Sequence, residues 1–387
     1  MSNYSVDRRR TLPTRGFLLL GFLVALLFLV SAGTAMGAPK MSQMAGTTSL
    51  ESSGLPNPAD SSVLVNEKPG TNQFRAAIQR ARQNASVVFA WGATAEELLA
   101  AIPGAPVQIS TTDHQANGPT VSYYATYPNR PPTVGSFTLI NVDAPGEVPE
   151  NGDDMLDEEM PGFLEHVQAL YAENVNASAD SLVAPQAYVT STPVWAGDID
   201  WGYSCYYLDG GNVVYLSDCY EHFQAWWESG EGSPTYDWYY AKASLLTDPT
   251  DPTQWQNKTS TFKYQANGTG RTIVDYDVGQ DMGSSTWSVS VDGNGGSYGW
   301  SWTQPNLAPS SAQSLPSWFK AIYSYALNTP AGRDPAWTRP GFTEKVSQGS
   351  AFSVYMVGTL VYQKGGLFPQ TKTVSNIDNK VVTFSHP

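Results

Sequence analysis

The clearest alternation in the chain lies between Ser285 and Thr303. Large apolar residues take every second position on both sides of a Gly-rich segment: Trp287, Val289, Val291, Tyr298, Trp300 and Trp302. A period of two is typical of a strand with one wet face. Asn294-Gly295 favours a type I′ turn, which would place Trp287 opposite Trp302. The pattern therefore predicts a β-hairpin with all its large side chains on one face.

Helical spacing occurs twice before residue 180. Phe74, Ala77, Ile78 and Ala81 predict a helix over residues 72–84. The apolar residues between Phe163 and Tyr171 predict another, which we expect to begin near Pro161 because proline is favoured in a first turn. Thr94 and Glu97 form a capping box for a short helix. Apolar runs predict strands at 87–91, 107–110, 121–127 and 137–142. Residues 71–187 are therefore expected to form a small α+β region.

The composition changes after residue 187. Nine of the twelve Trp fall between Trp195 and Trp302, with turn residues at a spacing typical of a sandwich or barrel. We expect a hairpin joining 262–266 to 272–276, a helix carrying Trp318, Ile322 and Tyr325, and closing strands at 351–362 and 381–384. The predicted fold is mainly β with some α, in which residues 188–387 form an antiparallel β-sandwich-like domain after the α+β region.

The first 38 residues have the layout of a secretion signal. Four arginines precede the apolar run 17–30, and small residues follow at 31–38. Cleavage after Gly37 or Ala38 would release a secreted protein. Residues 16–38 carry no charge, so the alternative is an uncleaved anchor that tethers the chain to a membrane. Residues 39–70 are rich in Ser, Gly and Pro and are expected to be a flexible linker.

The charge balance argues against nucleic acid as a partner. The chain has 21 basic and 35 acidic residues; the first 38 hold four arginines and one aspartate, which leaves 17 and 34. Such a surface repels phosphate backbones. The acidic run between Glu147 and Glu165 lacks the order of a calcium loop, and we expect a solvated loop and helix start there. No phosphate loop, dinucleotide fingerprint or zinc-binding helix is present, so we expect no metal and no cofactor.

Cys205 and Cys219 are the only cysteines. In an exported chain they are expected to form a disulfide. A three-residue turn at 211–213 would bring them opposite each other, whereas a tight Gly210-Gly211 turn would leave them out of register. Four sequons predict glycosylation sites at Asn84, Asn176, Asn257 and Asn267.

The sequence offers only weak candidates for catalytic residues. There is no Gly-x-Ser-x-Gly elbow, and His166 is expected to be a surface residue on its helix. A glycosidase needs two carboxyls across a cleft, for which the aromatic-rich region offers Glu221, Glu228, Asp198 and Asp200. Most carboxylates in an acidic protein are solvated, so an enzyme is the less favoured class.

Binding is the favoured class of function. Aromatic rings can stack on sugars, and Tyr, Trp, Ser, Gly and Asn are equally the residues of protein-binding surfaces. The binding candidates are Trp226, Trp227, Trp238 and Tyr239. Trp226-Trp227 lies either on a strand, with opposed side chains, or on a short helix with a shared buried face. We expect a secreted or surface-tethered protein that recognises a glycan or an extracellular protein through exposed aromatics. A glycosidase-like hydrolase or a structural surface component is the alternative.

Overall fold

The computed structural model describes residues 48–49, 63–65, 69–111, 118–128, 130–145, 147, 151–176, 193–229, 233–278, 285–290, 297–302, 306–365 and 369–386. These residues belong to one compact unit, Met44–Pro387. The expected signal or anchor at 1–38, and most of the linker, lie outside them. Across this part of the chain, no helix has both the length and the hydropathy needed to cross a membrane.

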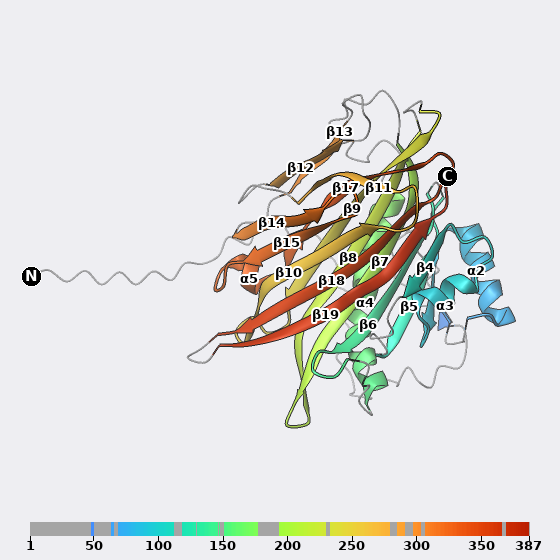
Figure 1. Cartoon of the computed structure of the whole chain (residues 1–387). Helices are drawn as coiled ribbons and strands as arrows, with labels where there is room; N and C mark the ends of the chain where they lie inside the picture. The colour runs from blue at the N-terminus through green and yellow to red at the C-terminus, as the bar shows by residue number, and fades with distance from the viewer. Residues whose placement is uncertain are drawn as a thin grey trace, which may run out of the picture. The chain divides into compact units, whose positions relative to one another are not determined.

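Two large sheets make up this unit (Figure 1). Sheet A has the strand order β1 (Thr48–Ser49), β2 (Val63–Val65), β3 (Val87–Trp91), β5 (Thr120–Ala125), β6 (Thr133–Asn141), β7 (Pro193–Asp209), β8 (Asn212–Glu228), β9 (Tyr236–Pro249), β17 (Gly341–Ser347) and β11 (Thr272–Asp277), with β16 (Ala336–Thr338) also on β9. Sheet B has the order β14 (Leu307–Ser314), β15 (Trp318–Tyr325), β10 (Trp255–Ala266), β18 (Phe352–Lys364), β19 (Gln370–Phe384) and β4 (Val107–Thr111).

The two sheets pack face to face around an aromatic core. Phe223 of β8 stacks on Tyr264 of β10 and on Phe352 and Phe384 of β18 and β19, with ring centroids 6.1 to 6.3 Å apart. Successive strand residues point to opposite faces, so each strand of sheet A gives one set of side chains to this core and the other set to the far face. The expected fold, mainly β and sandwich-like with a small α region before it, is confirmed.

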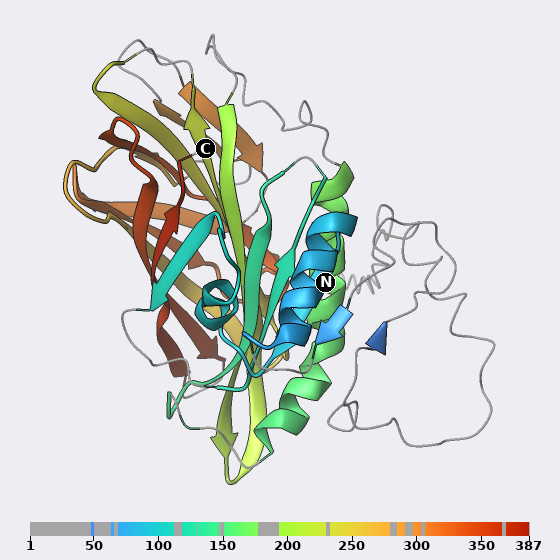
Figure 2. The same cartoon turned by 90° about the vertical axis from the view of Figure 1, so that its right-hand side faces the viewer.

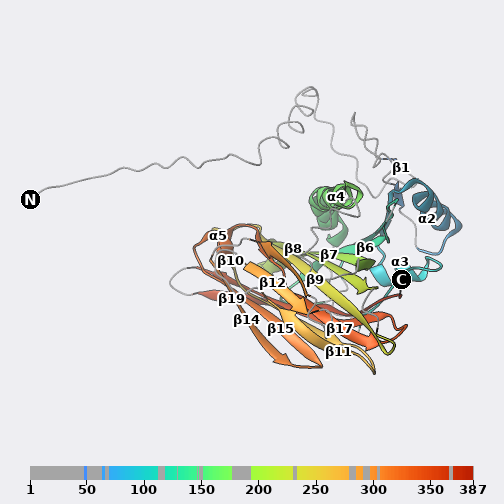
Figure 3. The same cartoon turned by 90° about the horizontal axis from the view of Figure 1, so that it is seen from above.

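Helices cover the far face of sheet A at one end. Figures 2 and 3 show α2 (Asn72–Asn84) and α4 (Gly152–Asn176) on the side of sheet A away from sheet B. The short helix α3 (Ala95–Ala100) packs against β4, β5 and β6, and α5 (Pro330–Arg333) packs against β10 and β16. Strands from both sides of residue 188 share sheet A, since β6 pairs in parallel with β7. The domain boundary expected there stays a prediction.

Local signals in the N-terminal half are confirmed. Helix α2 has its expected bounds and is capped by Thr71, whose side chain accepts from the Phe74 N–H. The capping box of Thr94 and Glu97 is present at α3. The expected start of α4 at Pro161 is wrong, because the helix begins at Gly152 and contains Pro161. The acidic residues Asp153 and Asp154 lie in its first turn, where the helix dipole favours negative charge.

Two predictions in the C-terminal half are wrong. Residues Trp318–Tyr325 form strand β15 rather than a helix, and its residues alternate between the core and the outer face. The expected hairpin between 262–266 and 272–276 does not form, since β10 pairs with β15 and β18 while β11 pairs with β17. In both places a short apolar pattern fitted two structures, and the pairing of distant strands decided between them.

The Trp-rich hairpin forms with a different register. Strands β12 (Ser285–Ser290) and β13 (Ser297–Trp302) pair Trp287 with Trp300 and Val289 with Tyr298, whereas the Asn294-Gly295 turn predicted Trp287 opposite Trp302. A shift of two residues leaves each residue on its original face, so the apolar pattern could not distinguish these registers.

The expected disulfide is not formed. The β7–β8 hairpin closes tightly at Gly210 and Gly211, both with positive φ, and a bulge after Cys205 places that residue opposite Ser217. Cys219 pairs with Tyr203 instead, so the cysteines are diagonal neighbours. Their backbones are then about 7–8 Å apart, which is too far for a disulfide. The Cys219 Sγ lies 3.2 Å from the Tyr362 hydroxyl. Neither thiol forms a disulfide, and both are buried.

We expect the unreduced protein to carry two titratable thiols. A thiol reagent should modify both cysteines once the chain is unfolded without reductant, and should react slowly with the native protein because both thiols are buried. Intact-mass measurement after labelling checks this. A mass that shows no label until a reductant is added would contradict the pairing described above.

Candidate functional site

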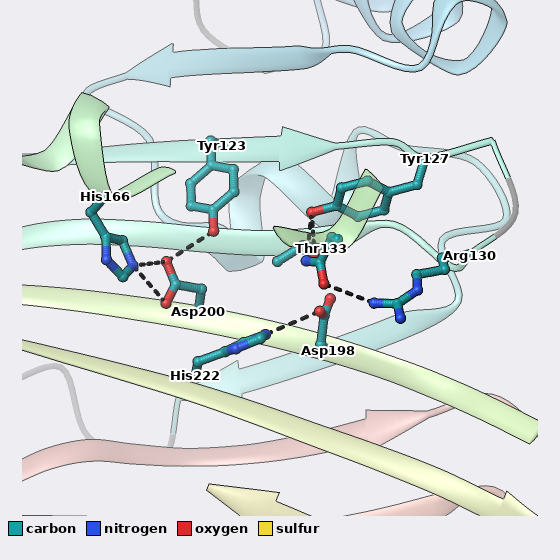
Figure 4. Close-up of polar contacts among 9 residues, drawn as sticks. Tyr123, Tyr127, Arg130, Thr133, His166, Asp198, Asp200 and His222 are labelled. Atoms are coloured by element: carbon teal, nitrogen blue, oxygen red, sulfur yellow. Dashed lines mark hydrogen bonds and ion pairs between the residues drawn. The ribbon is translucent and has the colours of Figure 1, made fainter. Parts of the chain in front are cut away.

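A buried polar cluster lies between α4 and sheet A, built around two neighbouring aspartates of β7. Asp198 and Asp200 are two residues apart and so point to the same face of the strand, the face that α4 covers (Figure 4). Their exposed fractions are only 2% and 0%. Burying charged groups is costly unless partners compensate, and both aspartates have them.

Asp200 receives three hydrogen bonds. The Nε2 atom of His166, on α4, lies 3.1 and 3.0 Å from its two oxygens, and the Tyr123 hydroxyl donates to Oδ2 at 2.9 Å. Gly135 allows the bond between Tyr123 and Asp200, because it lies between these two residues in the register of β5, β6 and β7. A Cβ there would come within 2.2 Å of the Tyr123 ring. The glycine therefore leaves the space through which tyrosine reaches aspartate.

Asp198 is held by the other histidine of the cluster. The His222 Nε2 atom, from β8, lies 3.1 Å from the Asp198 Oδ2 atom. The second oxygen, Oδ1, is buried and has no hydrogen-bond partner among the described residues. The two aspartate–histidine pairs thus lie side by side, one bridging β7 to α4 and the other bridging β7 to β8.

A chain of polar contacts extends the cluster toward the end of α4. Asn174 donates to the Tyr127 hydroxyl at 3.1 Å, and that hydroxyl lies 2.8 Å from the Thr133 Oγ1 atom. Arg130 donates to the Asn174 Oδ1 atom at 2.9 Å, and its guanidinium lies 4.8 Å from the centroid of the Trp195 ring. Helix α4 thus bonds to β7 through His166 and to the connection between β5 and β6 through Asn174.

Burial and charge act in opposite directions on the central pair. Burial alone would raise the pKa of Asp200, but the positive charge and hydrogen bond of His166, together with His222 and Tyr123, lower that pKa below its ordinary value. Burial alone would lower the pKa of His166, whereas the Asp200 carboxylate raises it. The pKa of Tyr123 is raised well above its usual value, mainly by burial and in second place by the negative charge of Asp200. The hydroxyl therefore keeps its proton and remains a hydrogen-bond donor. The pair is therefore ionised around weakly acid pH.

The expectation that His166 is a surface residue is wrong, because its imidazole is bound to Asp200 and stacks on the Tyr220 ring at 4.0 Å between centroids.

Of the four weak catalytic candidates, only Asp198 and Asp200 lie in the same cluster. Glu221 points into the sandwich core and accepts from the Tyr264 hydroxyl at 3.1 Å, and Glu228 is buried at the end of β8. The aspartates face imidazoles under a helix, which differs from two carboxyls across an open cleft.

Two of the four predicted binding aromatics are not exposed. Trp226 is 4% exposed and stacks on Tyr240 at 4.7 Å, and Tyr239 is 0% exposed inside the sandwich. Both lie on long strands of sheet A whose two faces are packed, which is why they are buried. Trp226-Trp227 adopts the strand arrangement with opposed side chains. Trp227 and Trp238 are half-buried.

The sequons differ in accessibility. Asn84 is exposed and Asn267 half-buried, while the side chain of Asn176 lies outside the described residues. Asn257 is 2% exposed within β10, and its amide donates toward the carbonyls of Thr247 and Ala331. The predicted glycosylation site at Asn257 therefore begins inside a paired strand, where its side chain is buried.

A second candidate site lies on the outward face of sheet B. In one cross-strand row, Gln265 of β10 pairs with Trp318 of β15 on one side and with Tyr355 of β18 on the other. In the neighbouring row, Lys263 pairs with Lys320. All five side chains are half-buried, and we call them the lysine–aromatic surface. This surface is not predicted from the sequence, because the spacing of Trp318, Ile322 and Tyr325 also fits a helix; the strict alternation of residues 318–325 is the signal that indicates it.

No family model and no curated protein matches the chain. Solved structures give weak likenesses to β-rich pore-forming proteins. One is a "Pore forming protein" with a TM-score of 0.31 and 7% identity, covering 47% of this chain and 91% of the other. Another is Clostridium perfringens delta-toxin, with a TM-score of 0.30 and 8% identity, covering 46% and 90%.

Filling the space at Gly135 should damage the cluster. We expect Gly135→Ala to lower the free energy of unfolding by about 1–3 kcal/mol, because the new methyl group forces the Tyr123 ring away from Asp200. Gly162→Ala is the matched control: it lies in α4 with open space around it, and should raise stability by about 0.5–1 kcal/mol. Urea unfolding measures both. Equal effects of the two substitutions would contradict the packing argument.

The His166–Asp200 pair should give stability a specific pH dependence. Because the pKa of His166 is raised on folding, His166 contributes fully to the free energy of unfolding below pH 6.5. This contribution is lost as the pH rises through the pKa of His166 in the folded protein. Because the pKa of Asp200 is lowered on folding, Asp200 contributes fully to the free energy of unfolding above pH 3.8, and this contribution is lost on further acidification. We therefore expect His166→Gln to cost more stability at pH 6 than at pH 9.

Tyr123→Phe is the control for this experiment, because it removes a hydrogen bond to Asp200 but no titrating imidazole. It should cost about 1–3 kcal/mol at both pH values, the penalty for a buried acceptor that loses its donor. If urea unfolding shows the same pH dependence for His166→Gln as for the unmodified chain, the pair does not stabilise the docking of α4.

Proposed function

We propose that this protein is an extracellular binding protein that recognises a glycan on the outward face of sheet B. The observation that carries the proposal is the cross-strand row in which Trp318 and Tyr355 flank Gln265. The extracellular location rests on the signal-like first 38 residues. Recognition through aromatic side chains was the expectation from composition; the row supplies a place where such recognition can occur.

The row supports binding of an extended ligand. Trp318 and Tyr355 belong to strands on either side of β10, so their backbones are about 10 Å apart, twice the strand spacing. An oligosaccharide of a few rings covers that distance. The apolar C–H faces of its rings can pack on the indole and phenol, and Gln265 between them offers both a donor and an acceptor to hydroxyl groups.

The scaffold beneath the row is rigid. Phe319, Ala321 and Tyr323 alternate with the outward residues of β15 and are fully buried. The Tyr355 hydroxyl donates to the Asn379 Oδ1 atom at 2.7 Å, which fixes the ring. A surface held in place before the ligand arrives loses less conformational entropy on binding, and this favours recognition by a sheet face over recognition by a loop.

The outward face also presents small hydroxyl side chains. Thr261 and Thr359 pair with each other across β10 and β18 on this face, and Ser310 and Ser314 of β14 lie at its edge. Helix cover is concentrated on the opposite side of the molecule, over sheet A (Figure 3). Hydroxyls and amides around two rings are the chemistry that a sugar, with many hydroxyls and apolar ring faces, requires.

Removal of the Trp318 ring should weaken glycan binding. We expect the full-length secreted chain to bind members of a glycan array, and Trp318→Ala to lose at least about tenfold in affinity, which is about 1.4 kcal/mol. Trp238→Ala is the matched control, since Trp238 is another half-buried tryptophan with a lysine over its ring, but on sheet A. It should change affinity less than about twofold. Thermal unfolding verifies that both variants fold. Loss in Trp238→Ala with none in Trp318→Ala would place recognition on sheet A.

A further inference from the structure

We infer that the glycan bound at this surface is anionic, with sulfate or carboxylate groups that contact Lys263 and Lys320. The inference rests on the proposed function and specifies its ligand. It starts from the register of β10 and β15, in which these two lysines lie directly opposite each other. Like charges in that position destabilise a sheet, so a free protein with this arrangement bears an electrostatic cost.

Both ammonium groups gather at one ring. The Nζ atom of Lys263 lies 5.3 Å, and that of Lys320 5.7 Å, from the centroid of Trp318. Lys263 also donates to the Gln265 Oε1 atom at 2.7 Å. Cation–π contacts of this kind offset part of the repulsion and hold two positive charges beside the aromatic row. The charges and the rings therefore belong to one surface.

Among the described residues, the strands around the two lysines offer no acidic side chain to relieve the repulsion. Strands β10, β14, β15 and β18 contain no Asp or Glu, in a chain whose formal net charge is −14. Within the described part of the chain, the ion pairs involve neither Lys263 nor Lys320. Partial burial and the nearby Lys320 charge lower the pKa of Lys263. An anionic group placed between the two lysines would remove this cost, so binding is favoured by charge complementarity.

The remaining features favour a glycan over other anions. The rings are half-buried on a sheet face and are flanked by Gln, Thr and Ser, which suit hydroxyl groups. A membrane surface would be met better by projecting apolar side chains, and a nucleic acid would meet the strongly negative remainder of the protein. The geometry thus commits this surface to a sulfated or carboxylated polysaccharide.

The test compares charged and neutral glycans on the full-length chain. The probes are array members with and without sulfate or carboxylate groups, together with vesicles containing phosphatidylserine. We expect acidic glycans to bind, and the double variant Lys263→Gln/Lys320→Gln to lose at least about tenfold in affinity for them. Lys364→Gln, on acid-free β18 but not opposite another lysine, is the control and should change affinity less than about twofold. Thermal unfolding confirms that each variant folds.

The outcomes separate this inference from the proposed function. If neutral glycans bind as tightly as acidic ones and the double variant binds both normally, the anionic ligand is disproved while glycan binding stands. If no glycan binds at all, the proposed function fails and the inference fails with it. Binding of the phosphatidylserine vesicles in preference to the acidic glycans would overturn the choice of a glycan in favour of a membrane surface.

Discussion

The structure depends on how sheet A buries both of its faces. One face meets sheet B through stacked aromatic rings, and the other is covered by α4, whose His166 binds the same Asp200 carboxylate as Tyr123 of β5. An ionised carboxylate in a fully buried position is tolerated only with such partners. Because α4 and α2 occupy the far face of sheet A, the outward face of sheet B is the broad sheet face without helices over its centre (Figure 3).

The reliable sequence signals were those whose meaning is local. Thr71 and the Thr94–Glu97 box mark helix starts through bonds within a few residues, and the period of two in β12 and β13 correctly indicated a hairpin. In the segment Trp318–Tyr325, local signals are not sufficient to predict the structure. Trp318, Ile322 and Tyr325 fit a helix, whereas Phe319, Ala321 and Tyr323 fit a strand. The choice was made by pairing with β10, more than fifty residues away in the chain, which local spacing does not encode.

The candidate sites were harder to predict for the same reason. Asp198 and Asp200 alternate with Ile199 and Trp201, so their shared face was readable from β7 alone. Their partners were not, because His166 comes from α4 and Tyr123 from β5, each brought in by tertiary packing. Gly135 matters only because it lies between two such residues in the register. Likewise, the facing of Lys263 and Lys320 follows from strand order rather than from sequence separation.

The distribution of charge in the folded chain links these observations. Several acidic residues are buried in sheet A and paired with histidine, tyrosine or arginine, as Asp200 is with His166 and Glu344 with Arg271, whereas four neighbouring strands of sheet B contain no acidic residue. Simple solubility does not require an acid-free face, since acidic side chains would serve it well, and stability is not improved by lysines that oppose each other. An anionic ligand of the kind proposed would neutralise the two opposed lysines, and the rings beside them would pack on its apolar sugar faces.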